Sequence, residues 1–440
     1  MKNLLLSLLF LVLYSNLYSQ NGWYQQYSSL YKINDIYFLN ENTGWATGDS
    51  GLVVKTTNGG NNWINISTPP THNLYSVHFI NANTGCVAGG YRTFGGSSYY
   101  YSGSVYKTTN GGINWVVIGA SGIYAMPLSV FMITSDSILY GAGGLSNTHT
   151  EGHLSRTTNG GTNFSQSFSQ FNGFQFKSIS FVNNSTGFAI SHYRNHEGAG
   201  DDRIYRTTDF GTNWTQMYIL TSGSSFEPAL NEIQFINNLT GFAAGNGRVL
   251  FTSNGGFNWI DRGTGTNSYQ TVNFINENTG WIGGYKNGDT SGVLKTTNAG
   301  LNWHRVTNTY SPIMVKKIQF VNSLTGWACG DNIIMKTVTG GVIGIQSISN
   351  VIPDKFSLSQ NYPNPFNPNT IINYQLTINS LVVLNVYDVN GRLVKNLVNE
   401  KQSAGSYEVN FDGSGLPSGT YIYRIQSGDF SETKKMLLLK

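Results

Sequence analysis

The chain has 440 residues, with 26 Lys or Arg against 22 Asp or Glu, so its formal net charge is only +4. Charged residues make up 11% of the sequence, well below the roughly 25% that is typical of soluble domains. Because the sequence also lacks a basic run, the composition argues against nucleic acid and anionic membranes as partners.

The N-terminal segment has the pattern of a secretory signal peptide. Met1–Ser19 contains one Lys followed by the apolar run Leu4–Tyr14, which suits a cleaved signal and is short for a membrane span. We expect cleavage between Ser19 and Gln20. Because no Cys follows this point, we expect no lipoprotein anchor, and we expect no transmembrane segment in the mature chain.

An eight-residue phrase recurs along the chain at intervals of about 45 residues, a period that indicates a solenoid or a propeller. The first copy is T-T-N-G-G-N-N-W at Thr56–Trp63, and a seventh copy at Thr337–Gly341 stops before its aromatic residue. The third and eighth positions of the six full copies are Asn58 and Trp63, Asn110 and Trp115, Asn159 and Phe164, Asp209 and Trp214, Asn254 and Trp259, and Asn298 and Trp303.

A second phrase precedes each copy and has the alternation of a β-hairpin. Ile36–Trp45 reads I-Y-F-L-N-E-N-T-G-W, with Asn and Gly at the expected turn. Each repeat therefore predicts four antiparallel strands, which form one propeller blade. Seven repeats predict an all-β fold with a seven-bladed β-propeller over residues 20–345. Related phrases start at Val77, Val130, Ile179, Ile233, Val272 and Ile318.

The two ends of this region complement each other. The seventh repeat lacks its outer strand, whereas Gly22–Tyr27 reads G-W-Y-Q-Q-Y, similar to N-W-T-Q-M-Y at Asn213–Tyr218. We expect Trp23–Ser28 to form the outer strand of the last blade beside Val338–Thr339, which would lock the first and last blades together.

The spacing T-x-N-x-G-x-N-W resembles the Asp-box, or BNR, repeat. The fuller unit is similar to the propeller of the photosystem II assembly-factor family, over roughly Gln20 to Gly344, and this resemblance implies a fold rather than an activity. Repetition in every blade favours a structural role. The Asn or Asp would bond its own turn, the following Gly would adopt positive φ, and the aromatic ring would fill the gap between sheets.

The two cysteines are expected to be separate buried thiols. Cys86 occupies the position that is aromatic in other repeats, and Cys329 belongs to the seventh repeat. Because the first blade separates them, their Cα atoms should exceed the reach of about 7 Å for a disulfide, so we predict that both act as small apolar residues.

A Pro-rich segment, Pro353–Pro368, marks the end of the repeats. We predict a linker at 346–353 and a second domain, a small β-sandwich, at 354–440. The V-N-G-R sequence at Val389–Arg392 predicts a hairpin turn. The expected strands are Thr370–Leu376, Leu381–Tyr387, Tyr407–Phe411, Gly419–Ile425 and Glu432–Leu439.

This second domain resembles the type A C-terminal sorting domain of the type IX secretion system. The resemblance is carried by Y-P-N-P-F-N at Tyr362–Asn367, V-Y-D-V-N-G-R-L at Val386–Leu393, L-P-S-G-T-Y at Leu416–Tyr421 and the ending K-K-M-L-L-L-K. It implies a Gram-negative bacterium of the Bacteroidetes–Chlorobi group, passage through the periplasm, recognition by the translocon, and release or attachment at the cell surface. A plain β-sandwich is the alternative. The sorting-motif residues are Tyr362, Pro363, Asn364, Pro365, Phe366, Asp388, Gly391, Gly419 and Tyr421.

The candidate binding residues lie between the second and third strands of the repeats. These connections are long in repeats two (90–103), three (144–153), four (191–203) and six (285–292), all on one face of the expected propeller. Variable loops on a regular scaffold commonly bind ligands, and Tyr among Gly and Ser suits recognition. We predict glycan or protein binding there. The candidates are Tyr91, Tyr99, Tyr100, Tyr101, His149, His192, Tyr193 and His196.

Two other function classes remain open. A carbohydrate-active enzyme of BNR type would need two paired carboxylates, and the sequence pairs none of the candidates, so we predict no catalytic residue. A structural surface-layer component is the third hypothesis. We expect a monomer without cofactor or metal, with the loop histidines as solvated side chains. The carboxylate candidates are Glu151, Glu197, Asp201, Asp202, Glu227 and Asp289.

Overall fold

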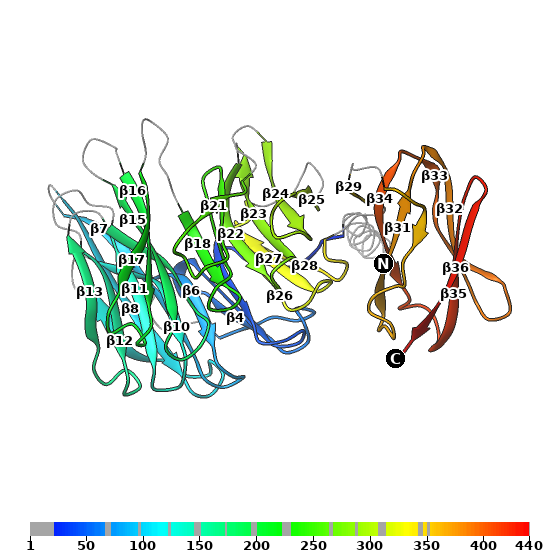
Figure 1. The fold of residues 1–440 in the computed structure, drawn as a ribbon. Helices are drawn as coiled ribbons and strands as arrows, with labels where there is room; N and C mark the ends of the chain where they lie inside the picture. The colour runs from blue at the N-terminus through cyan, green and yellow to red at the C-terminus, as the bar shows by residue number, and fades with distance from the viewer. Residues whose placement is uncertain are drawn as a thin grey trace, which may run out of the picture. The chain divides into compact units, whose positions relative to one another are not determined.

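The computed structural model describes residues 22–66, 72–95, 98–121, 125–144, 151–171, 174–194, 200–221, 230–263, 267–286, 289–306, 314–341, 346–349 and 353–439. The predicted signal peptide lies outside these residues. The chain divides into two compact units, Trp23–Thr337 and a unit that holds the chain from Val338 onward (Figure 1). The described residues include no helix with the length and apolarity needed to cross a membrane.

The first unit is an all-β propeller, as predicted. Its described strands form seven four-stranded antiparallel blades, of which the third and fourth share one sheet through the pair Gly143↔Gln175. In blades one to six, the innermost strand is followed along the chain by two central strands and an outer strand.

The strand bounds of blades one to three are as follows. Blade one contains β2 (Ile33–Phe38), β3 (Gly44–Gly48), the short 3₁₀ turn η2 (Asp49–Gly51), β4 (Val53–Thr56) and β5 (Ile64–Asn65). Blade two contains β6 (Asn73–Phe79), β7 (Gly85–Gly95), β8 (Ser98–Thr108) and β9 (Val116–Ser121). Blade three contains β10 (Met126–Met132), β11 (Ile138–Gly143), β12 (Glu151–Thr157) and β13 (Ser165–Phe171).

Blades four to seven repeat the same order. Blade four contains β14 (Phe174–Phe181), β15 (Gly187–Arg194), β16 (Gly200–Thr207) and β17 (Thr215–Thr221). Blade five contains β18 (Leu230–Phe235), β19 (Gly241–Gly245), β20 (Arg248–Thr252) and β21 (Ile260–Asp261). Blade six contains β22 (Asn267–Phe274), β23 (Gly280–Lys286), β24 (Asp289–Thr296) and β25 (His304–Arg305). Blade seven contains β26 (Lys317–Phe320), β27 (Gly326–Gly330), β28 (Ile333–Thr337) and the N-terminal strand β1 (Tyr24–Ser28).

The N-terminal strand closes the ring. β1 pairs with β28 from Tyr24↔Lys336 to Ser28↔Ile333, so its partner is Ile333–Thr337 and not the expected Val338–Thr339. Trp23 is 3% exposed and packs edge-on against Phe320 with ring centroids 5.8 Å apart. Trp63 makes the same contact with Phe38 at 5.9 Å within blade one. Trp23 thus supplies the aromatic residue that the seventh repeat lacks.

Stacked rings join consecutive blades. Trp45 on β3 stacks on Phe79 of blade two, with ring centroids 3.6 Å apart, and Trp327 on β27 stacks on Phe38 at the same distance across the point of closure. In blade two, Cys86 occupies the position of Trp45. Its counterpart in blade three is Met132, at the position of Phe79, and both residues belong to the same buried cluster. Cys86 and Cys329 are both buried.

The repeated phrase forms the turn between the third and fourth strands. In blade one, Thr56 Oγ1 accepts a hydrogen bond from Gly60 N at 2.8 Å, and Asn58 Oδ1 accepts one from Asn62 N at 2.9 Å. Lys55 lies over the ring of Trp45 and donates to Gly111 O in blade two at 3.3 Å. These contacts are local or join neighbouring blades, which is a structural role. The same pair of turn bonds recurs in the other five full copies.

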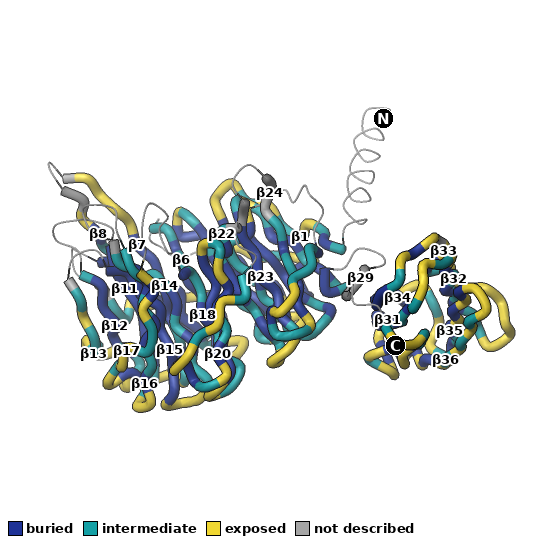
Figure 2. Tube along the Cα trace, turned by 45° about the horizontal axis from the view of Figure 1, so that its top comes forward, coloured by how far each residue is buried: buried dark blue, intermediate teal, exposed yellow. Residues whose placement is uncertain are grey.

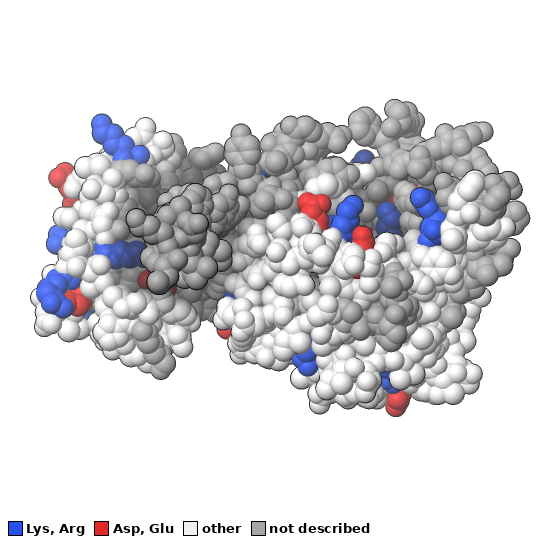
Figure 3. All heavy atoms as spheres, turned by 180° about the vertical axis from the view of Figure 1, so that it is seen from behind, with Lys and Arg blue, Asp and Glu red and all other residues white. Residues whose placement is uncertain are grey.

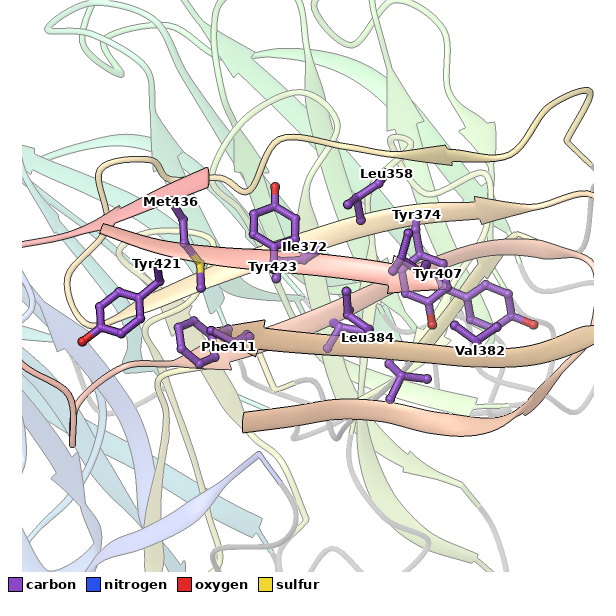
Figure 4. Close-up of a cluster of buried hydrophobic side chains, with 14 of the residues drawn as sticks. Leu358, Ile372, Tyr374, Val382, Leu384, Tyr407, Phe411, Tyr421, Tyr423 and Met436 are labelled. Atoms are coloured by element: carbon purple, nitrogen blue, oxygen red, sulfur yellow. The ribbon is translucent and has the colours of Figure 1, made fainter. Parts of the chain in front are cut away.

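The second unit is a sandwich of two four-stranded antiparallel sheets. One sheet has the order β29 (Gln346–Ser349), β34 (Gly405–Asp412), β31 (Asn369–Leu376), β30 (Ser357–Leu358). The other has the order β33 (Leu393–Gln402), β32 (Ser380–Tyr387), β35 (Gly419–Ser427), β36 (Phe430–Leu438). Figure 4 shows the core side chains of both sheets pointing toward one another.

One prediction for this region needs correction. The linker expected at 346–353 is shorter, because Gln346–Ser349 pairs with β34 as a strand of the sandwich. The sequence also gave no prediction for β30 or β33. β33 lies at the edge of its sheet, and its sequence does not alternate apolar and polar residues regularly. The pattern that would predict a strand is therefore weak.

Candidate binding face

The two ends of the propeller differ in regularity. The turn between the first and second strands lies beside the repeated turn, because Gly59 N donates to Asn42 O and Gly111 N to Asn83 O, both at 2.8 Å. We call this end the box face. The opposite end, which we call the hairpin face, carries the connections between the second and third strands. These connections differ from blade to blade, so only this face is asymmetric.

The connections expected to be loops are largely hairpin extensions of the strands. β7 and β8 stay paired as far as Gly95↔Ser98, and β15 and β16 as far as Arg194↔Gly200. In blade five the corresponding strands end at Gly245↔Arg248. Figure 2 shows the outer part of the β7–β8 hairpin as exposed. The longest of these extensions therefore belongs to blade two and is a ribbon of two paired strands.

The aromatic residues of the β7–β8 hairpin have different environments. Tyr91 and Tyr100 are exposed, and so is Phe94, at 65%. Tyr101 is 2% exposed, so the expectation that it belongs to a binding loop is wrong; on a paired strand, its side chain faces away from that of Tyr100. Tyr99 belongs to β8, and its side chain lies outside the described part of the chain.

In the blade-four hairpin, His192 and Asp202 are buried and contact each other or the neighbouring blade. His192 is buried, and its Nδ1 lies 2.7 Å from Asp202 Oδ1, while Asp202 Oδ2 accepts a hydrogen bond from Leu230 N at 2.7 Å. His192 is thus not the solvated loop residue that the sequence suggested. Tyr193 stacks on Phe174 with centroids 4.7 Å apart. His149 and His196 lie outside the described residues.

The acidic candidates are engaged locally where they are described. Arg203 pairs with both carboxylate oxygens of Asp201, at 2.8 and 3.0 Å, and Glu151 accepts a hydrogen bond from Gln166. Glu197 and Glu227, and the side chain of Asp289, lie outside the description. Within the described ranges, no group of three or more His, Cys, Asp or Glu side chains is arranged to hold a metal ion. Figure 3 shows a surface on which uncharged atoms predominate.

The innermost strands of the seven blades surround a cavity of about 380 Å³. Lys317 on β26 of blade seven donates a hydrogen bond to Glu232 on β18 of blade five. Its Nζ also lies 3.9 Å from Asp35 Oδ1 on β2 of blade one. Burial raises the pKa of Asp35 to about 6, although Lys317 opposes the shift. Burial alone would lower the pKa of Lys317, but Glu232 and Asp35 raise it above its ordinary value.

Many polar side chains of the channel cap the backbone edge of the next blade. Asp35 Oδ2 accepts a hydrogen bond from Val77 N at 2.9 Å, and Glu232 Oε2 accepts one from Val272 N at 2.9 Å. Gln319 on β26 lies two residues beyond Lys317. It accepts a hydrogen bond from Phe38 N at 2.6 Å and donates one to Phe38 O at 2.9 Å. These bonds satisfy the inner edge strands, which would otherwise present open backbone groups.

His78 takes the position of Gln319 in blade two. Its Nδ1 accepts a hydrogen bond from Met132 N at 3.3 Å, and its ring lies between those of Tyr37 and Phe131, with centroids 4.7 and 4.3 Å away. Burial, with a smaller effect of Lys317, lowers the pKa of His78 to about 3. The imidazole is therefore neutral at physiological pH.

The sequence did not identify these channel residues, although a signal was present. In every innermost strand, a polar or charged residue stands directly before an Ile or Val. Aligning the seven strands by that position would have placed all of these side chains in one ring. The residues before that Ile or Val are Asp35, Ser76, Ser129, Ser178, Glu232, Thr271 and Lys317.

These features define an all-β protein in which a propeller with one asymmetric face precedes a separate β-sandwich. Residues 360–439 match the family model of the secretion system C-terminal sorting domain, a segment that contains all nine predicted sorting-motif residues. The chain is therefore a cargo of the type IX secretion system, which is recognised by that machinery and exported to the outer surface.

The propeller resembles proteins of known sequence and known structure. A 59-residue segment is 41% identical to photosystem II stability/assembly factor HCF136, chloroplastic, of rice (Oryza sativa subsp. japonica), and the match spans 13% of this chain and only 14% of the rice protein. The structure of YCF48 bound to D1 peptide has a TM-score of 0.52 at 18% identity, covering 72% of this chain and 94% of that one. YCF48 from Cyanidioschyzon merolae gives 0.50 at 19% identity, covering 72% and 98%. These likenesses show the propeller fold.

Proposed function

We propose that the exported protein binds a glycan or protein ligand at the hairpin face of its propeller. The observation that carries this proposal is the β7–β8 hairpin, which holds Tyr91, Phe94 and Tyr100 in exposed positions on a paired ribbon. The ring of Tyr91 also lies beside that of His72, with centroids 4.4 Å apart. Exposed aromatic residues on a rigid element contribute contact area to a ligand at a small entropic cost.

Symmetry supports the choice of face. The repeated turns on the box face have the same hydrogen bonds in each full copy, so they offer a ligand no unique position. The hairpins differ among blades, and selectivity needs such a difference. The structure of YCF48 bound to D1 peptide has this fold, so the fold is compatible with a peptide ligand.

The proposal can be tested with glycan and protein arrays probed with the purified full chain. The double variant Phe94→Ala/Tyr100→Ala should lose the signal that the wild type gives. Phe257→Ala is the matched control, because Phe257 is also 65% exposed but lies within the repeated turn of blade five on the box face. An array signal that survives the double variant, or that disappears in the control, would refute binding at the hairpin face.

Glycoside hydrolysis is the second candidate, and one observation favours it. Asp35 and Glu232 line the same cavity, and a buried carboxyl with a pKa of about 6 has the acidity of a general acid. Hydrolysis of an array-positive glycan by the wild type, and its loss in Asp35→Asn, would support this function. Turnover that persists in Asp35→Asn would exclude this residue as the acid.

A further inference from the structure

We propose that the channel binds the terminal residue of a neutral glycan, a pyranose with equatorial hydroxyl groups, at the inner edge of β14 in blade four. The inner edge is the side of an innermost strand that is not paired within its own blade. This inference rests on the proposed function, because it names the ligand class, and it goes beyond that function by placing the end of the ligand inside the channel. The hydrogen-bonding side of the site consists of the backbone N–H groups of Ile179 and Phe181. The rings of Tyr37, His78 and Phe131 form its apolar side, and all five residues line the cavity.

The inner edge of β14 lacks a cap at the level of Ile179. In the next blade, Ser178 Oγ accepts a hydrogen bond from Ile233 N at 3.2 Å. Ser129, which has the same position before blade four, instead donates to Phe176 O at 3.3 Å. No described side chain therefore accepts a hydrogen bond from Ile179 N. The N–H groups that a side chain caps at this level are those of Ile36, Val77, Val130, Ile233, Val272 and Ile318.

The same interruption occurs at the level of Phe181. In blade five, Gln234 accepts a hydrogen bond from Phe274 N at 2.6 Å and donates one to Phe274 O at 3.1 Å. Phe131 has the position of Gln234 in blade three, and its side chain has no polar atom to bond Phe181. Phe79 N is also uncapped, but Phe79 is not among the residues that line the cavity. The N–H groups that a side chain caps at this level are those of Phe38, Met132, Phe235, Phe274 and Phe320.

Both uncapped groups face the channel. The N–H groups of an antiparallel strand point alternately to its two sides. Val182 N donates to Thr186 O, toward β15, so the N–H groups of Phe181 and Ile179 point to the inner edge. The carbonyl groups of these two residues point the same way, and a hydroxyl group suits such an edge because it both donates and accepts.

The uncapped stretch is short. It is bounded on one side by the bond from Ser129 to Phe176 O, and β14 itself ends at Phe181. A peptide strand that adds to a sheet edge draws its affinity from a series of main-chain hydrogen bonds, and two N–H groups provide few of them. A sugar residue, which carries several hydroxyl groups on one ring, fits this short stretch better.

The apolar side of the site is a continuous aromatic wall. The ring of His78 lies 4.7 Å from that of Tyr37 and 4.3 Å from that of Phe131, and Phe131 lies 5.5 Å from Phe181, measured between centroids. Because His78 Nδ1 accepts a hydrogen bond from Met132 N, the neutral ring carries its proton on Nε2. Neither this Nε2 nor the Tyr37 hydroxyl bonds another described residue, so both can serve a ligand. A pyranose with equatorial hydroxyl groups presents C–H groups to an aromatic wall and directs its hydroxyl groups to the rim.

The ionic residues inside the channel favour a neutral ligand. Lys317 donates to Glu232 and lies near Asp35, and both carboxylates also accept backbone hydrogen bonds. These charges are already engaged with one another and with the backbone. A ligand without charge leaves this arrangement intact.

The cavity connects the site with the hairpin face. At that end of the innermost strands, β-bulges leave Asn34 and Lys177 out of their ladders, and both residues line the same cavity as Phe181. The cavity volume of about 380 Å³ falls within the range of about 300–1,000 Å³ of small-ligand sites. The channel can therefore hold the end of a glycan whose remainder lies on the hairpin face.

The experiment titrates cellotriose, a neutral glycan with equatorial hydroxyl groups, into the purified full chain and into variants of Phe131. Phe131→Gln copies Gln234, so it should cap Phe181, remove the ring and weaken binding roughly a hundredfold. Phe131→Leu leaves the edge uncapped and should weaken binding only about tenfold, whereas Phe131→Tyr should stay within about twofold of wild type. Phe257→Gln, on the box face, is the control, and thermal unfolding confirms that each variant is folded. Bound cellotriose should also slow amide exchange of Ile179 and Phe181.

Equal affinities of wild type and Phe131→Gln, equal losses in Phe131→Gln and Phe131→Leu, or unchanged amide exchange in β14 would overturn the inference. Absence of cellotriose binding would overturn it as well. The proposed function would still stand if Phe94→Ala/Tyr100→Ala abolished an array signal that Phe131→Gln retains. Equal binding of β-mannotriose, which has an axial hydroxyl group on each ring, would contradict the equatorial preference. Binding of acetylated, amidated trialanine that is lost in Phe131→Gln, without binding of cellotriose, would assign the edge to a peptide instead of a glycan.

Discussion

The replacement Trp23→Ala tests ring closure. Trp23 is 3% exposed and fills the aromatic position of blade seven against Phe320, so its removal leaves a cavity at the closure point. A buried Trp→Ala change costs about 3–5 kcal/mol, which should appear as a lower denaturant midpoint for the propeller. The sandwich has its own core, and its transition should stay where it is, which makes it an internal control.

The assay is guanidinium unfolding of the full chain, followed by tryptophan fluorescence for the propeller and by a probe attached to the sandwich. Trp63→Ala is the comparison variant, because Trp63 makes the same edge-on contact with Phe38 inside an ordinary blade. The two variants should be destabilised similarly. A loss below about 1 kcal/mol in Trp23→Ala, beside a large loss in Trp63→Ala, would show that β1 does not close the ring.

Four further predictions follow from single residues or segments. Because the folded protein keeps His78 neutral down to a pKa of about 3, the unfolded chain binds the proton first as pH falls below about 6.5, so His78 should lower the unfolding free energy in this window by a few kcal/mol. Asp35, with a folded-state pKa of about 6, contributes with the opposite sign in both proteins, so wild type should lose more stability on acidification than His78→Gln, which copies Gln319, and equal slopes for both proteins in urea unfolding would contradict the prediction. Ala299 adopts a φ of 58°, so Ala299→Gly should raise the unfolding free energy by about 1 kcal/mol, and a lower midpoint would be the opposing result. Tyr101→Ala should destabilise the propeller by about 3 kcal/mol and Tyr100→Ala by no more than about 0.5 kcal/mol, an order that thermal unfolding can reverse or uphold. Removal of 346–440 should leave a folded propeller in the periplasm, and its normal appearance in the medium would show that the sorting domain is not required for export.

Much of the fold could be predicted because the same pattern of strands and turns recurs in seven repeats. The missing aromatic residue of the last repeat and the spare Trp23 were both visible in the sequence, and so was the Pro-rich boundary of the sandwich. The β7–β8 hairpin was misjudged as a loop because Gly and Ser dominate its composition. On a paired strand alternate residues face opposite sides, and this is why Tyr100 is exposed and Tyr101 is buried.

The residues of the channel could not be predicted without knowing how the blades are arranged around the ring. Lys317, Glu232 and Asp35 come from blades seven, five and one, and no local pattern predicts which blades face each other across the axis. His192 and Asp202 could have been paired if β15 and β16 had been extended to Arg194↔Gly200, because the two residues are directly opposite in that register. The candidate site thus escaped prediction where it depends on contacts between distant segments.

The most direct test of the central claim is hydrogen–deuterium exchange of the full chain with and without the strongest array ligand. Binding at the hairpin face predicts slower exchange for the amides of the β7–β8 hairpin and for the β-bulges at Asn34 and Lys177. The repeated turns, such as Asn58–Trp63, should exchange unchanged. Protection of those turns without protection of the hairpin would contradict the account.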